Sequence, residues 1–306
     1  MKNFKLLSLL LICNFCFGQV RTEIAINELL NGTLLTTNPN NKTNLIIIIA
    51  GSGPTDRDGN QSNLKNNSLK FLANGIVNDK NDVFNFDKRF FAQFKSGKFD
   101  EKNTNFNDMV TDVTSIIQYF KNTKKYKNII IAGHSEGSLI GMIAARKDVA
   151  AFISIAGAGR SADLILEEQI EKQAPSILQE VKLGLEKLKK GETFENKNAM
   201  LNSLFRASVQ PYLISWFQYN PQVEIKKLHI PTLIINGTKD IQVGVSDAQL
   251  LKTAKADAQI EIIENMNHVL KIINGDQKEN MASYTNPDLP VSDALIEKIK
   301  IFINIL

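Results

Sequence analysis

Residues 128–146 read NIIIAGHSEGSLIGMIAAR. The first part, 128–132, is a short apolar run typical of a strand buried on both faces of a sheet. Leu139, Ile140 and Ile143 then recur at helical spacing, which predicts a helix over 138–146. Between the two lies Gly133-His134-Ser135-Glu136-Gly137, a match to the pattern G-x-S-x-G. The segment therefore predicts a strand that turns sharply into a helix, with Ser135 at the turn.

This turn makes Ser135 a candidate nucleophile. A strand that turns directly into a helix holds the central serine in a strained backbone conformation with its hydroxyl exposed above the sheet. Gly133 and Gly137 lack side chains, so the strand and the helix can approach closely. The start of the helix also favours negative charge nearby. The alternative is a glycine-rich turn with an unused serine, since a bare G-x-S-x-G also occurs by chance.

The rest of the chain alternates short apolar runs with longer amphipathic stretches. An N-terminal hairpin is predicted from 23–27 and 33–37, joined at the turn dipeptide Asn31-Gly32. Further strands are expected at 45–49, 83–86, 128–132, 151–156, 231–236 and 259–263, and helices at 66–77, 105–120, 138–146, 245–253 and 292–303. Strands that alternate with helices predict an α/β fold, with a mostly parallel sheet flanked by helices on both faces.

One interval, from 156 to 231, has no strand pattern. It contains three predicted helices at 161–172, 175–190 and 199–217, the second with apolar residues at helical spacing. Because this interval lies between two predicted parallel strands, we expect a helical cap at about residues 160–226 over the end of the sheet where the loops emerge. The alternative is that these helices extend the core on one face.

The chain has three histidines as candidate bases for Ser135. His134 neighbours the serine and should point away from its hydroxyl. His229 precedes a strand, at the wrong edge of a parallel sheet for a site. His268 follows the last predicted strand, at the carboxyl edge where open α/β sheets bind ligands. His268 is therefore the predicted base.

The acid that orients this base should follow another strand at the same edge. Asp240 comes after the strand at 231–236 and a glycine, and the chain order Ser, Asp, His is the one expected for this arrangement. Asp247 is the rival, but it falls inside the next predicted helix, where a carboxylate at a helix start or in solvent is expected.

Acyl transfer also needs donors for an oxyanion. One is expected to be the backbone N–H of Glu136, the residue after the serine. The second should come from the loop 51–54, with Ser52 the first choice and Gly53 the next. This loop lacks the lysine and hydroxyl ending of a P-loop and the third glycine of a dinucleotide fingerprint, which argues against a phosphate-binding role for its glycines.

The N-terminus has the layout of a secretory signal peptide over residues 1–18. Lys2 and Lys5 precede an apolar run, and Cys16-Phe17-Gly18 places small residues at a plausible cleavage site. A buried N-terminal helix is the alternative; Cys16 as a lipoprotein site is disfavoured by the residues before it. Cleavage would leave a domain of residues 19–306 without cysteine. The expected location is exported, either periplasmic or extracellular.

Composition excludes several classes. The chain has 306 residues, 43% of them hydrophobic, which is enough apolar surface for a large core and excludes intrinsic disorder. The formal net charge of +4 falls to +2 on loss of Lys2 and Lys5, which is too small to indicate a nucleic-acid partner. The apolar run of the leader is too short to span a bilayer, and no second long apolar segment follows, so no stable membrane span is expected. No feature indicates an oligomeric state.

The motifs together resemble those of bacterial α/β-hydrolases, and most closely the EstD-type carboxylesterases, which are related to the serine aminopeptidase-like branch. The likeness covers most of the mature chain. The segments that carry it are 51–60 (GSGPTDRDGN), 86–89 (FDKR), 133–137 (GHSEG), 231–240, 267–268 (NH) and, in the cap, 204–216. One departure is that Arg89 is followed by FFAQF at 90–94, where related sequences have a Gly-x-Gly turn.

The resemblance implies a serine esterase that hydrolyses small-molecule carboxylic esters without a metal or an organic cofactor, with Ser135, Asp240 and His268 matching the catalytic triad. An acyl-enzyme intermediate is expected. Two alternatives stay open. A peptidase or amidase could use the same triad, and a hydrolase-like domain without catalytic activity could bind a ligand or partner. The aromatic residues at 90–94 could line an apolar substrate site or pack under the cap, and Asp56-Arg57-Asp58 is expected to lock its own loop by ion pairs.

Overall fold

A computed structural model describes residues 18–37 and 44–306. Nearly all of the predicted signal peptide, residues 1–17, lies outside the described residues, and only its last residue, Gly18, falls within them. No helix in the described part of the chain is long and apolar enough to cross a bilayer.

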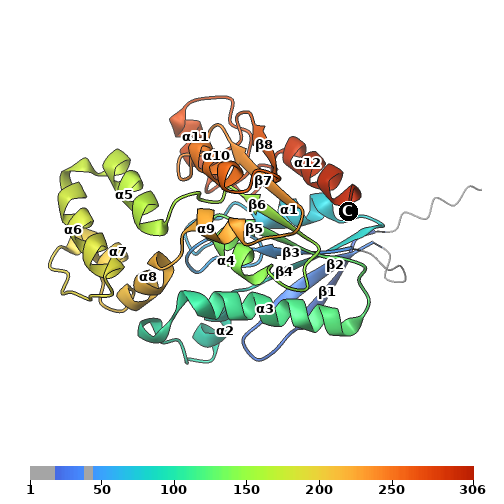
Figure 1. The fold of residues 1–306 in the computed structure, drawn as a ribbon, viewed down its shortest axis with the longest axis horizontal. Coiled ribbons are helices and arrows are strands. Elements are labelled where there is room, and N and C mark those ends of the chain that lie inside the picture. The colour runs from blue at the N-terminus through green and yellow to red at the C-terminus, as the bar shows by residue number, and fades with distance from the viewer. Residues whose placement is uncertain (1–17, 38–43) are drawn as a thin grey trace, which may run out of the picture.

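The core of the fold is an eight-stranded sheet with the order β1-β2-β4-β3-β5-β6-β7-β8 (Figure 1). From β4 to β8 in this order neighbouring strands are parallel, whereas β1 pairs antiparallel with β2 and β2 antiparallel with β4. This confirms the predicted fold class. The strands are β1 Val20–Ala25, β2 Asn31–Thr36, β3 Asn44–Ile49, β4 Asn81–Phe86, β5 Ile129–His134, β6 Ala151–Ile155, β7 Thr232–Gly237 and β8 Gln259–Ile263.

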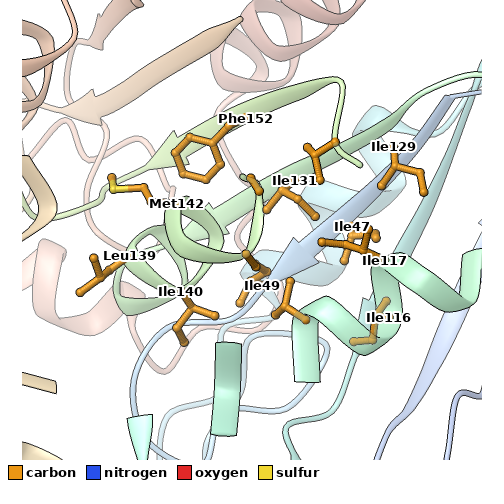
Figure 2. Close-up of a cluster of buried hydrophobic side chains, with 14 of the residues drawn as sticks. Ile47, Ile49, Ile116, Ile117, Ile129, Ile131, Leu139, Ile140, Met142 and Phe152 are labelled. Atoms are coloured by element: carbon orange, nitrogen blue, oxygen red, sulfur yellow. The ribbon is translucent and has the colours of Figure 1, made fainter. Parts of the chain in front are cut away.

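One face of the sheet packs against α3 (Phe106–Thr123), α4 (Glu136–Ala144), α9 (Pro221–Lys226) and α10 (Val245–Ala254). Side chains alternate between the two faces of a strand, so Ile47 and Ile49 of β3 lie on this side together with Ile131 and Phe152. Figure 2 shows these side chains between the strands and α4, with Ile117 reaching them from α3. This cluster fixes α4, and with it the turn that carries Ser135, against the sheet.

The opposite face is covered by α1 (Ser68–Ile76) and α12 (Asp293–Asn304). The alternate residues of the same strands, such as Ile46 and Ile48, pack there against Leu72 of α1 and Phe302 of α12. Both faces of the central strands are therefore buried, which is why the sequence shows them as continuous apolar runs.

Between β6 and β7 the chain forms a helical segment that extends beyond the end of the sheet (Figure 1). Its helices are α5 (Ala162–Gln173), α6 (Leu178–Lys189), α7 (Asn202–Phe205) and α8 (Gln210–Phe217). They pack around a cluster of their own, in which Val181, Leu185, Leu188 and Phe205 are buried. Most of this segment thus has a core of its own, while Tyr212 and Trp216 of α8 also pack against the cluster on the α3 side of the sheet.

The single helix predicted over 199–217 is wrong. The helix is broken at Arg206, whose backbone has φ −54° and ψ 143°. Gln210, completely buried, donates from Nε2 to the carbonyl oxygens of Phe205 (2.7 Å) and Phe194 (2.8 Å). A buried side chain that takes over the carbonyl at the end of α7 stabilises the break, and local apolar spacing does not reveal such a contact.

Three further features differ from the sequence-based expectation. Residues 90–94 belong to a short helix, α2 (Arg89–Lys95), and a helix α11 (Gln277–Ser283) precedes α12. The first hairpin does not turn at Asn31-Gly32. The chain reverses before it, where Asn27 Oδ1 accepts hydrogen bonds from the backbone N–H groups of Leu29 (2.9 Å) and Leu30 (3.0 Å). An asparagine side chain that bonds to its own turn can replace the expected dipeptide.

Gly32 instead lies within β2 for a packing reason. A Cβ atom at this position would be 2.4 Å from Cζ of Phe84 and 2.5 Å from the carbonyl oxygen of Asn85 in the neighbouring strand. The glycine therefore makes room for the aromatic ring beneath it.

Gly32→Ala should lower the free energy of unfolding by about 1–3 kcal/mol, because the added methyl group overpacks the contact with Phe84. Urea denaturation measures the change. Asn31→Ala is the matched control, since Asn31 is the exposed first residue of the same strand and should change stability by no more than about 0.5 kcal/mol. Equal stabilities of the two variants would contradict the packing role of Gly32.

Candidate active site

The turn from β5 into α4 has the geometry that its sequence predicts. Ser135 stands at its apex with φ 55° and ψ −120°, a backbone conformation that costs energy for any residue other than glycine. A Cβ atom on Gly133 would lie 2.2 Å from the carbonyl oxygen of Gly137, and one on Gly137 would lie 2.4 Å from that of Ile49. The glycines are required because three backbone segments meet here.

The side chains of Ser135, His268 and Asp240 form a hydrogen-bonded series. The Ser135 hydroxyl lies 3.1 Å from Nε2 of His268, and Nδ1 of His268 lies 2.8 Å from Oδ2 of Asp240. The Asp240 side chain is fully buried and that of His268 is 5% exposed. With Nδ1–H donating to the carboxylate, Nε2 is left as the acceptor for the serine proton. This arrangement can take a proton from Ser135 and stabilise the resulting imidazolium.

Asp240 is itself held in place by the backbone. Its Oδ1 accepts hydrogen bonds from the N–H groups of Gln242 (2.8 Å) and Val243 (2.9 Å). Both oxygens are thus occupied, one by the loop after β7 and the other by His268, which leaves a single orientation for the imidazole.

The other candidates from the sequence lie elsewhere. His229 is exposed at the opposite edge, before β7. Asp247 lies in the first turn of α10, but it is fully buried rather than solvated, because Arg160 binds both of its oxygens at 3.0 and 2.7 Å. A buried carboxylate needs such a partner. Asp247 makes no hydrogen bond to His268 among those of the described residues.

His134 has a position that the sequence did not predict. Its ring lies 5.0 Å from that of His268, and its Nε2 is 2.8 Å from the carbonyl oxygen of His268. Since a carbonyl oxygen only accepts, Nε2 of His134 carries the proton and donates it. Burial, followed by the nearby His268, lowers the pKa of His134 to about 4. His134 is thus a neutral donor that holds the backbone of His268.

The proposed oxyanion donors border the same space as Ser135. Ser52 and Ser135 line two cavities together, and Glu136 lines one of them. The N–H of Glu136 belongs to the first turn of α4, where backbone donors have no acceptor within the helix. Gly53 has φ 74° and lines neither of the two cavities, so it shapes the loop, and Ser52 is the better placed of the two predicted donors.

The side chain of Glu136 makes an ion pair that sequence reasoning missed. It is 1% exposed, and its Oε2 lies 2.9 Å from Nζ of Lys88, which is 3% exposed. Lys88 also donates to the carbonyl oxygen of Gly51, and the hydroxyl of Tyr212 in α8 donates to Oε1 of Glu136 at 2.6 Å. Burial and the adjacent carboxylate raise the pKa of Tyr212. The only signal in the sequence was the place of Lys88 in the segment FDKR.

The two cavities differ in chemistry. The first, of about 130 Å³, is lined on the side of the helical segment by Ile165, Leu166 and Trp216. The second, of about 270 Å³, is lined by His268 and by uncharged polar side chains that include Gln61, Asn66 and Tyr284. Ser135 lies at the border of both, so a molecule bound at its hydroxyl can extend one end into each.

Arg57 and the aromatic residues of α2 lie outside the two cavities at Ser135. Arg57 binds Asp87 with Nε (3.0 Å) and Nη2 (2.7 Å), so the loop is locked to the end of β4 rather than by ion pairs within itself. Phe94 is 57% exposed and stacks on Phe99 at 4.1 Å between ring centroids. None of the aromatic residues of α2 lines either cavity at Ser135. Within the described ranges no group of three or more His, Cys, Asp or Glu residues could hold a metal ion.

Comparison with known proteins identifies relatives among esterases. No family model matches the chain. Esterase EstD of Thermotoga maritima is 25% identical over 248 residues, which cover 78% of this chain but only 57% of the length of EstD. The resemblance inferred from the motifs is thus confirmed in sequence.

Solved structures show the fold. Est1E of Butyrivibrio proteoclasticus superposes with a TM-score of 0.58 at 18% identity, over 93% of this chain and 99% of Est1E. An esterase of Pyrococcus furiosus gives 0.56 at 14% identity, over 94% and 91%. The peroxisomal α/β-hydrolase Lpx1 of Saccharomyces cerevisiae gives 0.56 at 12% identity, over 90% and 80%. The chain has the α/β-hydrolase fold.

His134→Gln should weaken the dependence of stability on pH. The pKa of His134 is about 4 in the folded protein and near 6.5 when unfolded, so the unfolded state binds more protons and stability falls as the pH drops from 6.5 toward 4. This residue accounts for a loss of about 3 kcal/mol across that window. The variant should therefore lose about 2 kcal/mol less than the wild type between pH 7 and 4.5. Urea denaturation at both pH values measures this.

His229→Gln, at the exposed histidine, is the control. If His134→Gln and His229→Gln showed the same pH dependence of unfolding, the burial of neutral His134 would not be its source.

Proposed function

We propose that this protein is a serine hydrolase that cleaves carboxylic esters through an acyl-enzyme intermediate. The observation that supports it most is the hydrogen-bonded series from Ser135 through His268 to Asp240, at the apex of a strained turn. The sequence likeness to esterase EstD, which is an esterase by name, favours esters over other acyl substrates.

The proposed reaction begins when Ser135 Oγ attacks the ester carbonyl and His268 Nε2 takes the serine proton. Asp240 keeps the imidazole oriented and stabilises its charge. The negative charge on the carbonyl oxygen is stabilised by the N–H groups of Ser52 and Glu136. His268 then gives its proton to the leaving alkoxide, and water activated by the same base releases the acid from Ser135.

The two cavities suggest how the ester lies. The leaving alcohol must be within reach of His268, so we assign it to the larger, polar cavity that His268 lines. The acyl group then occupies the smaller cavity beside Ile165 and Leu166. In this proposal the helical segment α5 to α8, which lies within the cap expected at about residues 160–226, limits the length of the acyl chain.

Ser135→Ala should lower kcat for an aryl ester by a factor on the order of 10⁴ or more, because no other group forms the acyl-enzyme. A fluorophosphonate probe should label the wild type and fail to label the variant. Ser138→Ala is the matched control, since Ser138 bonds to Ser154 (2.7 Å) and not to His268. Labelling of Ser135→Ala would mean that another residue is the nucleophile, whereas no labelling of the wild type would argue for a binding protein without catalytic activity.

A panel of p-nitrophenyl esters graded by acyl length should show a preference for short chains, because the acyl cavity is only about 130 Å³. Leu166→Ala should shift the optimum to longer chains and raise kcat/KM for a long-chain ester about tenfold. Leu183→Ala, at a side chain of the same helical segment that is 54% exposed, should leave the optimum unchanged. An unchanged optimum in Leu166→Ala would refute this acyl assignment, and faster cleavage of aminoacyl amides than of esters would favour a peptidase.

A further inference from the structure

Lys88 occupies a position where a buried lysine has two distinct acceptors. It follows β4, and its ammonium group bridges the carbonyl oxygen of Gly51, in the loop after β3, and Oε2 of Glu136, at the start of α4. Each of these two residues is next to, or is itself, a proposed oxyanion donor. The ammonium group thus links the loop that carries the N–H of Ser52 to the residue that carries the other proposed donor, Glu136.

The bond to Gly51 has a geometric consequence for Ser52. The carbonyl of Gly51 and the N–H of Ser52 belong to one peptide unit, and no cis peptide bond occurs in the described residues. In a trans peptide the C=O and N–H bonds point in opposite directions. With the oxygen held by Lys88, the N–H of Ser52 points away from Lys88. A Cβ atom built on Gly51 would be 3.2 Å from Cβ of Ser135, so this peptide lies beside the serine.

The pair with Glu136 has an electrostatic consequence. An unpaired carboxylate one residue after Ser135 would repel an oxyanion that forms beside it, and a charge buried without a partner is costly. The ammonium group of Lys88, 2.9 Å away, compensates that charge, while Tyr212 binds the second oxygen. Donation to the Gly51 oxygen also polarises the peptide, which strengthens the N–H of Ser52 as a donor.

A purely structural role explains the pair less well. Two charges that are 3% and 1% exposed lose their hydration, and buried ion pairs often stabilise a protein no better than apolar side chains of similar volume. Other ion pairs in the same region, such as Arg89 with Asp112 at 2.7 Å, hold α2 to α3 without touching the loop at Gly51. The distinctive feature of Lys88 is its second acceptor.

We propose that Lys88 is a positioning residue that orients the Gly51–Ser52 peptide, so that the N–H of Ser52 faces the carbonyl oxygen of the substrate, while it neutralises Glu136. This inference rests on the proposed ester hydrolysis at Ser135. It names a side chain that controls a backbone donor, and that donor persists in any substitution of Ser52 other than proline.

The test compares an ester with the matching thionoester in the wild type and in Lys88→Met. Sulfur accepts hydrogen bonds poorly, so the rate advantage of the oxygen ester reports the oxyanion donors and not the overall integrity of the fold. Loss of one donor typically lowers kcat by about 10²–10³. We expect Lys88→Met to lower kcat for the ester by about 10² with little change in KM, and to lower the ester-to-thionoester ratio about tenfold.

Two further variants separate positioning from stability. The double variant Lys88→Met with Glu136→Gln removes both charges, so no unpaired carboxylate is left buried if Lys88→Met alone folds poorly. This double variant should show the same loss in the ester-to-thionoester ratio as Lys88→Met. Arg89→Gln breaks the neighbouring pair with Asp112 and should lower Tm while leaving the ratio as in the wild type. Fluorophosphonate titration counts folded sites in each sample.

Three outcomes would overturn the inference. These are a folded Lys88→Met with the wild-type ester-to-thionoester ratio, a double variant in which that ratio returns to the wild-type value, or an equal loss of the ratio in Arg89→Gln. Failure of the proposed function is recognised separately, because the wild type itself would then neither hydrolyse the ester nor react with the probe. A crystal structure of Lys88→Met offers a readout independent of activity, and an unchanged Gly51–Ser52 peptide there would also count against the inference.

Discussion

The site depends on the close approach of three backbone segments: the end of β5, the start of α4 and the end of β3. Gly133 and Gly137 allow this approach, and Ser135 adopts a positive φ at the point where they meet. The strained backbone of Ser135 is stabilised by the surrounding packing, because α4 is buried against the sheet through Ile140 and Met142 (Figure 2). A rigid helix behind a strained turn leaves the serine hydroxyl with few orientations, which is what a hydrogen bond to a distant histidine requires.

The sheet then brings the partners of Ser135 to the same edge. Asp240 follows β7 and His268 follows β8, and parallel strands end on one side. The local backbone completes the alignment, because two N–H groups hold Asp240 and the buried, neutral His134 holds the carbonyl of His268. Each member of the series is thus fixed by a contact outside the series.

Charges around the two cavities are paired rather than free. Arg160, which lines the smaller cavity, is bound to Asp247 through two hydrogen bonds, and Glu136 is bound to Lys88. Because each of these side chains is already bound to a partner of opposite charge, neither is free to bind a charged group of a substrate. This pattern is consistent with a neutral substrate such as an ester, whose charge develops only during the reaction.

From the sequence alone we could derive the succession of strands and of most helices along the chain, the turn at Ser135 and the residues of the hydrogen-bonded series. Each of these depends on local pattern: apolar runs, helical spacing and the position of a polar residue after a strand. Only the tertiary structure decided the break at Arg206, the strand position of Gly32, the partner of Asp247 and the bridge from Lys88 to Gly51 and Glu136. In each of these the deciding contact joins residues that packing brings together, such as Gly32 against the ring of Phe84 or Lys88 against two loops. Local patterns do not reveal such contacts, because a short segment does not specify which distant residue will pack against it.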